Sequence, residues 1–249
     1  MTRRAQHRGR VTTPSVRDAV TIAYVHDKEV AHSWHRSMLD LLLHDLSTTQ
    51  RVMAGGFIAV RYSTGGIVKA RNEAVAMFMA AKQDSDWLFW SDTDMGFAED
   101  TLDRLLAAAD PVERPIMGAL CFASKEIRPD GLNGYWTAPL PTVMDWKVTP
   151  SGEAGFAARF DYAPDSVVRC SGTGSACILI HRSVFDKIGP DPYEPLRNPS
   201  TGELIGEDLS FCARASQNDI PIHVHTGVPT SHLKPVWMGE VQFAMWPQS

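Results

Sequence analysis

Short apolar runs alternate with longer amphipathic segments along the first half of the chain. The runs at residues 87–90 (WLFW) and 116–122 (IMGALCF) contain no polar residue, which predicts strands that are buried on both faces. The segments between the runs carry apolar residues at helical spacing. This order predicts a parallel sheet with helices on both of its faces. The predicted strands are 20–25, 57–62, 87–90 and 116–122, and the predicted helices are 30–46, 67–82 and 98–109.

The second half has a different pattern, with more glycine, proline and aromatic residues. Residues 124–141 are predicted to be irregular, and 142–146 and 156–162 to be antiparallel strands joined through a turn at 150–152. The proline-rich segment 191–202 predicts a surface loop that could close over a substrate. The remaining predictions are strands at 167–170, 176–180 and 220–225 and helices at 182–188 and 209–217.

Two aspartates, Asp92 and Asp94, follow the apolar run 87–90 directly. Residues i and i+2 of an extended chain point the same way, and open α/β sheets bind ligands at the carboxyl ends of their strands. Two carboxylates this close repel each other unless a cation lies beside them, and their oxygens suit Mg²⁺ or Mn²⁺. The pair therefore predicts a cation site. The alternative is a polar turn in which one aspartate caps the next helix.

Composition limits the classes of function. The chain has 249 residues, average hydrophobic and charged fractions of 44% and 21%, and a net charge of −5, so no general affinity for nucleic acid or membranes follows. The four cysteines show no CxxC spacing and predict buried, reduced thiols, which suits the cytoplasm. The sequence shows no membrane span and no secretory signal, and the arginine-rich residues 1–18 predict a disordered basic tail.

Several polar residues next to the predicted strands are further candidates, each with a structural alternative. Tyr24 or His26 could contact a nucleotide base or could be packed rings. Arg71 could hold a diphosphate, brace the acidic site or form a surface ion pair. Either Asp208 or Glu207 could face the site, although acidic residues at a helix start are favoured by the helix dipole alone. A histidine after the last strand, His232, could be a nitrogen ligand to the same cation.

Five segments together have a fairly specific order and spacing. They are Ala70-Arg71-Asn72-Glu73-Ala74, Asp92-Thr93-Asp94, Gly172-Thr173-Gly174, Gly206-Glu207-Asp208-Leu209-Ser210-Phe211-Cys212 and His232. Over about residues 20–235 this pattern resembles the GT-A fold glycosyltransferases, nearest to family-2-like enzymes that include small phage-encoded members. The resemblance implies an α/β fold: an αβα sandwich with a mostly parallel central sheet and a smaller antiparallel acceptor-side sheet.

The resemblance also implies a domain organisation. Residues 19–240 would form one domain, with a nucleotide-sugar-binding half at 19–123 and an acceptor-side half at 124–240. Residues 241–249 would be a C-terminal tail. A phage-encoded chain would act in the host cytoplasm. The proline-rich loop 191–202 carries no acceptor signature, and the basic tail lies outside the family pattern.

For the donor, the resemblance implies a nucleotide-sugar, with a UDP-sugar expected, and Mn²⁺ or Mg²⁺. Asp94 would coordinate the cation that bridges the α- and β-phosphates. Asp92 would contact the ribose or the metal, and His232 would be another metal ligand. Arg71 would hold the diphosphate or the sugar.

Further donor contacts would come from the first strand and from the second half of the chain. Tyr24 and His26 would meet the base. Gly172, Thr173 and Lys234 are also assigned to donor binding by the resemblance.

The catalytic assignment depends on stereochemistry. In an inverting enzyme Asp208 would be the general base on the acceptor hydroxyl. In a retaining enzyme Glu207 and Asp208 would instead bind sugar hydroxyls. The acceptor could be a protein, a glycan or a lipid, and the predicted lack of a membrane anchor favours a soluble one. A homo-oligomer is left open.

Two other functions are consistent with parts of the pattern. A nucleotidyltransferase that activates a sugar phosphate would usually have a glycine-rich loop and a basic residue after the first strand, where this chain has Tyr24-Val25-His26-Asp27. A non-catalytic nucleotide-sugar-binding module would bind the donor without turnover.

Overall fold

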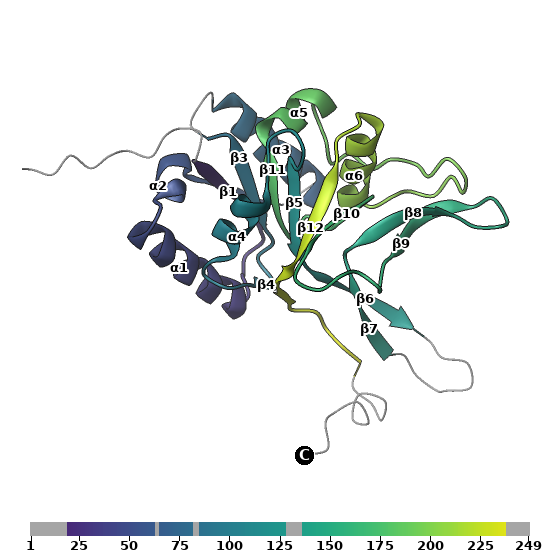
Figure 1. Cartoon of the computed structure of the whole chain (residues 1–249), viewed down its shortest axis with the longest axis horizontal. Coiled ribbons are helices and arrows are strands. Elements are labelled where there is room, and N and C mark those ends of the chain that lie inside the picture. Colours follow the sequence, from purple (N-terminus) through teal and green to yellow (C-terminus); the bar gives the residue numbers. More distant parts are fainter. Residues whose placement is uncertain (1–18, 63–64, 82–84, 128–135, 238–249) are drawn as a thin grey trace, which may run out of the picture.

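A seven-stranded sheet forms the centre of the computed structural model, which describes residues 19–62, 65–81, 85–127 and 136–237. The strand order is β10-β12-β5-β11-β3-β1-β2, and helices lie on both faces (Figure 1). The predicted tails at 1–18 and 241–249 lie outside the described residues. The strands are β1 (Val20–His26), β2 (Phe57–Arg61), β3 (Trp87–Ser91), β5 (Ile116–Leu120), β10 (Val167–Cys170), β11 (Cys177–His181) and β12 (Ile222–Pro229).

The sheet is mostly parallel, as predicted. Strand β1 pairs in parallel with β2 and β3, and β12 pairs in parallel with β5. The continuous parallel run expected for the first half is interrupted, however, because β11 lies between β3 and β5 and is antiparallel to both. Residues 177–180 of β11 are apolar and fully buried, which suits a central position covered on both faces. The edge strand β10 is antiparallel to β12.

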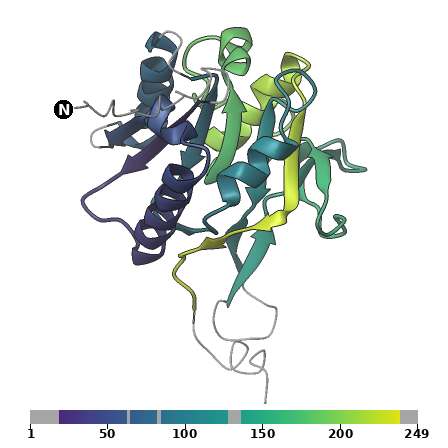
Figure 2. The same cartoon turned by 60° about the vertical axis from the view of Figure 1, so that its left-hand side comes forward.

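Two hydrophobic cores lie on opposite faces of the sheet, because successive strand residues point to opposite sides. Phe89 packs toward the face covered by α1, α2 and α4, whereas Trp90 packs toward α3, α5 and α6. Figures 1 and 2 show these layers from two directions. The helices are α1 (His32–Ser47), α2 (Arg51–Gly55), α3 (Gly66–Ala80), α4 (Thr101–Ala108), α5 (Arg182–Ile188) and α6 (Glu207–Gln217).

Small antiparallel pairs extend from one side of the central sheet (Figure 1). The pair β8 (Met144–Val148) and β9 (Ala154–Ala158) confirms the predicted hairpin with shifted bounds. The prediction of an irregular segment at 124–141 is wrong, because β6 (Phe122–Ile127) pairs with β7 (Trp136–Pro141). The prolines of β7 are tolerated because this strand has a partner on one side alone. Residues 128–135 lie outside the described part.

A last pair joins two distant segments. Strand β4 (Met95–Gly96) follows the two aspartates, and β13 (Ser231–His232) pairs with it in antiparallel register. Within the described ranges, no helix combines the length and the apolar character needed to cross a bilayer.

Candidate active site

The two aspartates lie where the apolar run predicts, at the carboxyl end of the buried strand β3. The parallel strands β1 and β2 end at the same edge of the sheet. The backbone N–H of Asp92 donates to the carbonyl of Ala176 (2.8 Å), and the N–H of Met95 donates to the carbonyl of Asp92 (3.2 Å). These bonds fix the turn, so that both carboxylates leave the sheet from an ordered backbone.

Asp94 is the centre of a charged group formed with residues from the chain's far end. Register between β4 and β13 places His232 opposite Met95. His232 Nε2 lies 3.1 Å from Asp94 Oδ1, and Lys234 Nζ donates to Asp94 Oδ2 at 2.7 Å. His232 Nδ1 lies 2.9 Å from the carbonyl of Phe122. Both ring nitrogens therefore face oxygen atoms, and a protonated ring satisfies both of them.

The pKa shifts follow from these contacts. Burial raises the pKa of Asp94, but hydrogen bonds from His232 and Lys234 outweigh burial and lower it to about 2. Burial lowers the pKa of His232, and the hydrogen bond to Asp94 outweighs it, so the pKa lies above its ordinary value. The group therefore holds an ionised Asp94 carboxylate at neutral pH, hydrogen-bonded by His232 and Lys234.

Asp92 belongs to a different charged group, built around Arg71. Arg71 Nη2 donates to both carboxylate oxygens of Asp92, at 2.9 and 3.2 Å, and lies 3.7 Å from Asp208 Oδ1. The arginine side chain is 1% exposed, and its guanidinium lies 5.3 Å from the ring centre of Trp90 and 5.4 Å from that of Tyr193. Its burial lowers the pKa of Arg71, but the nearby carboxylates outweigh burial and raise it. Burial raises the pKa of Asp92, and Arg71 opposes the rise.

Asp208 lies in the first turn of α6, which begins after Gly206. A Cβ placed on Gly174 would lie 3.8 Å from Asp208 Oδ2, so this residue neighbours the carboxylate at ordinary contact distance. Asp208 Oδ1 is buried and accepts no hydrogen bond from the described residues. This carboxylate oxygen has the capacity to accept a proton or a hydrogen bond from a ligand hydroxyl.

The Asp94 group suits a cation that is coordinated jointly by protein and substrate. Within the ranges that the structure describes, it does not form a metal centre whose ligands all come from the protein. The described residues contain no cluster of three or more His, Cys, Asp or Glu side chains arranged to hold a metal. Asp94 and His232 nevertheless supply an oxygen and a nitrogen, and the Phe122 carbonyl orients the imidazole as outer partners of metal ligands do. Sites with one or two carboxylates commonly complete their coordination with water and substrate phosphate. Asp92 is engaged with Arg71 instead.

Among the described residues, the predicted donor residues Tyr24, His26 and Thr173 make no side-chain hydrogen bond or ion pair with Asp92 or Asp94. The Tyr24 ring packs 4.9 Å from that of Trp34 and 5.9 Å from that of His26, on the α1 side of the sheet. Thr173 is 1% exposed and its backbone N–H donates to Cys212 Sγ, so it packs inside the core.

Gly172 and Glu207 are the two remaining residues that the sequence assigned to the site. A Cβ on Gly172 would lie 2.9 Å from Phe156, which explains the small residue at this crossing. Glu207 adds negative charge near Arg71.

The sequence reasoning missed Tyr193, whose side chain is fully buried and stacks on Phe211 (5.1 Å, 17°) while facing Arg71. Its backbone N–H donates to Asn72 Oδ1 at 2.9 Å. The residue lies in the proline-rich segment that was predicted to be a surface loop. The available signal was the adjacency of Arg71 and Asn72, two strong hydrogen-bonding groups on an otherwise apolar helix face.

Comparison with known proteins gives matches at the level of structure. No protein-family model and no curated protein sequence matches the chain. The crystal structure of A197 from STIV matches with a TM-score of 0.50 and 15% identity over 87% of this chain and 86% of that one. A crystal structure of GalNAc-T7 with UDP, GalNAc and Mn²⁺ matches with a TM-score of 0.52 and 14% identity over 87% of this chain.

The match with GalNAc-T7 spans 44% of that longer chain. At these identities the likeness concerns the fold. The chain therefore has the GT-A glycosyltransferase fold that its motifs predict.

Proposed function

We propose that the protein transfers a sugar from a nucleotide-diphosphate sugar to an acceptor hydroxyl, with a divalent cation at Asp94. The observation that carries the proposal is the group of Asp94, His232 and Lys234 at the carboxyl edge of a GT-A sheet. Mn²⁺ and a UDP-sugar are the expected partners, and the UDP, GalNAc and Mn²⁺ in the GalNAc-T7 structure support this choice. The cytoplasmic location and a protein or glycan acceptor stay predictions.

The Asp94 group suits the departure of a diphosphate. Asp94 and His232 would hold the cation, and Lys234 would turn from the carboxylate to a phosphate oxygen. The bound cation supplies Lewis-acid stabilisation of the negative charge that develops on the leaving group. His232 would give up its Nε2 proton on binding the cation, and its bond to the Phe122 carbonyl would keep the ring oriented.

The Arg71 group suits positioning. With 1% exposure, the side chain supports bracing of the acidic site over direct contact with a diphosphate. Arg71 would fix Asp92 for the ribose and would hold Asp208 nearby. Asp208 would take the proton of the acceptor hydroxyl, a contribution of typically about 10²–10⁴ in rate for a general base.

Donor hydrolysis and transfer can be measured as UDP release from a panel of UDP-sugars with Mn²⁺. We expect release by the wild type, its loss in excess EDTA, and its loss in Asp94→Asn. Asp103→Asn is a matched control, because Asp103 also pairs with a histidine, His44, and with a basic residue, Arg51. This group lies beside Trp87, at the opposite end of β3. Full activity of Asp94→Asn, or full activity in EDTA, would contradict the proposal.

A further inference from the structure

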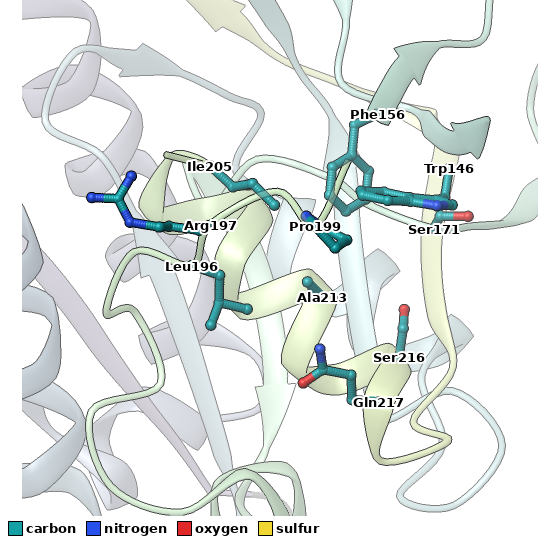
Figure 3. A pocket seen from close by; sticks show the side chains of 10 residues that line it. All are labelled: Trp146, Phe156, Ser171, Leu196, Arg197, Pro199, Ile205, Ala213, Ser216 and Gln217. Carbon is teal, nitrogen blue, oxygen red and sulfur yellow. The ribbon is translucent and has the colours of Figure 1, made fainter. Parts of the chain in front are cut away.

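A cavity of about 510 Å³ lies on the second half of the molecule (Figure 3). Its walls come from the β8–β9 hairpin, from residues 196–205 and from one side of α6. This volume is in the usual range of small-molecule sites. None of the sequence motifs described above accounts for the cavity, and its lining contains neither of the two aspartates.

Hydrogen bonds hold the walls in place. Asn198 Nδ2 donates to the carbonyl of Ala154 (2.7 Å), and the N–H of Ala154 donates to Ser200 Oγ (2.8 Å), so the proline-rich loop is tied to β9. The N–H of Leu196 donates to Ser210 Oγ (2.9 Å), which ties the same loop to α6. The cavity is thus formed before any ligand arrives, and a ligand does not have to order the loop on binding.

An aromatic wall closes one end of the cavity. Trp146 and Phe156 face each other across the hairpin in direct register, with ring centres 5.0 Å apart at 82°. Trp146 keeps 37% of its surface exposed. In Figure 3 the two rings stand together on one side, with Ser171 beside them. A flat apolar ligand surface can stack on such a wall.

The charge of the lining selects for a neutral ligand. Its described residues include no carboxylate to receive a cation. The one charged residue, Arg197, donates from Nη1 to the carbonyl of Gly202 (2.9 Å), and its guanidinium points away from the other labelled side chains in Figure 3. The hydroxyls of Ser171 and Ser216 and the amide of Gln217 have no recorded hydrogen bond within the described residues, so they are free to bind a ligand. A sugar ring combines apolar C–H faces with neutral hydroxyls at its edge.

The cavity adjoins the candidate base. A Cβ on Gly172 would lie 2.9 Å from Phe156 in the cavity wall and 3.0 Å from Leu209, the residue after Asp208. Phe156 packs against Gly172 between the two regions. A ligand in the cavity would therefore lie near the first turn of α6, which carries Asp208.

We infer that this cavity binds a neutral sugar residue of the acceptor, stacked on Trp146 and hydrogen-bonded by Ser171, Ser216 and Gln217. The acceptor is thus a glycan, and the cavity holds a residue next to the one that reacts. Its role as acceptor site rests on the proposed function, whereas saccharide binding itself needs neither donor nor cation.

The test measures binding of the fluorescently labelled full chain to an array of neutral and charged glycans, in EDTA and without donor. We expect binding to neutral glycans and a loss of about tenfold or more in affinity for Trp146→Ala, the cost typical of a central aromatic contact. Ser216→Trp, at an exposed position of α6, should fill the cavity and give the same loss while thermal melting confirms folding. Phe160→Ala is the matched control, because Phe160 is an exposed aromatic (69%) outside the lining.

Glycan binding by the cavity can be tested separately from the catalytic proposal. Asp94→Asn should bind the same glycans as the wild type, even though it should fail to release UDP. Absence of glycan binding, binding of sulfated or sialylated glycans alone, or binding that survives both cavity variants would overturn the inference.

Discussion

The two neighbouring aspartates have different partners. Residues 93–94 form a turn, so the extended geometry expected to aim both carboxylates at one point is not observed. The sequence predicts correctly that both aspartates follow the end of a buried strand. It does not reveal that Arg71 engages the first and that Lys234 engages the second, since these residues lie 21 and 140 positions away along the chain. Such long-range contacts depend on which strands pair. The spacing of apolar residues along the chain does not predict that pairing.

Removing the charge of Arg71 should destabilise the protein strongly. Arg71→Met keeps most of the side-chain volume but leaves Asp92 without its buried partner, and such a loss typically costs about 3–5 kcal/mol. The free energy of unfolding can be measured by urea denaturation. Arg36→Met is the control, because Arg36 pairs with Asp40 while 71% exposed, and water and salt screen such a pair so that its loss should barely change stability. If both substitutions lowered the free energy of unfolding equally, the interpretation that buried Arg71 stabilises Asp92 would be wrong.

Among the elements, buried strands were the most predictable. Strand β3 and helix α5 were predicted within one residue of their observed bounds because their apolar patterns are unambiguous. The place of β11 inside the sheet was not predicted, because a fully apolar run fits equally beside any buried neighbour. The β6–β7 pair was missed, since prolines in β7 argued against a strand that in fact has one partner.

The crossing at Gly172 should tolerate no side chain. A Cβ there would lie 2.9 Å from Phe156 and 3.0 Å from Leu209, so Gly172→Ala should lower stability by about 1–3 kcal/mol through overpacking. Gly155→Ala is the control within the same region, because a Cβ there would lie 4.0 Å from its nearest neighbour, Asn198 Nδ2, and its effect should be about 0.5 kcal/mol or less. Comparable melting temperatures for the two variants would show that the crossing is not tight.

At the scale of the whole molecule, two cores hold one sheet between them, and the cysteines lie in and around these cores. Cys121, Cys177 and Cys212 are buried, and Cys170 is half-buried. Burial raises the pKa of Cys121 to about 12 and that of Cys170 to about 11. The predicted reduced, inert thiols therefore have a physical basis in the packing of the sheet.

Thiol labelling tests this packing. Because thiolate is the reactive form, the folded protein should react slowly with a thiol-specific disulfide reagent at pH 7, and all four cysteines should react in guanidinium chloride. The measurement is absorbance against time, with free cysteine as the rate standard. Rapid reaction of several thiols in the folded protein would contradict the two-core arrangement.

Calorimetric titration of UDP with and without Mn²⁺ tests the central claim most directly. The account predicts binding that requires Mn²⁺ and is lost in Asp94→Asn and in His232→Ala. His44→Ala, which removes a histidine paired in the same way with Asp103, should bind as the wild type does. UDP binding that is equally strong in EDTA, or that survives the loss of Asp94 and His232, would contradict the account.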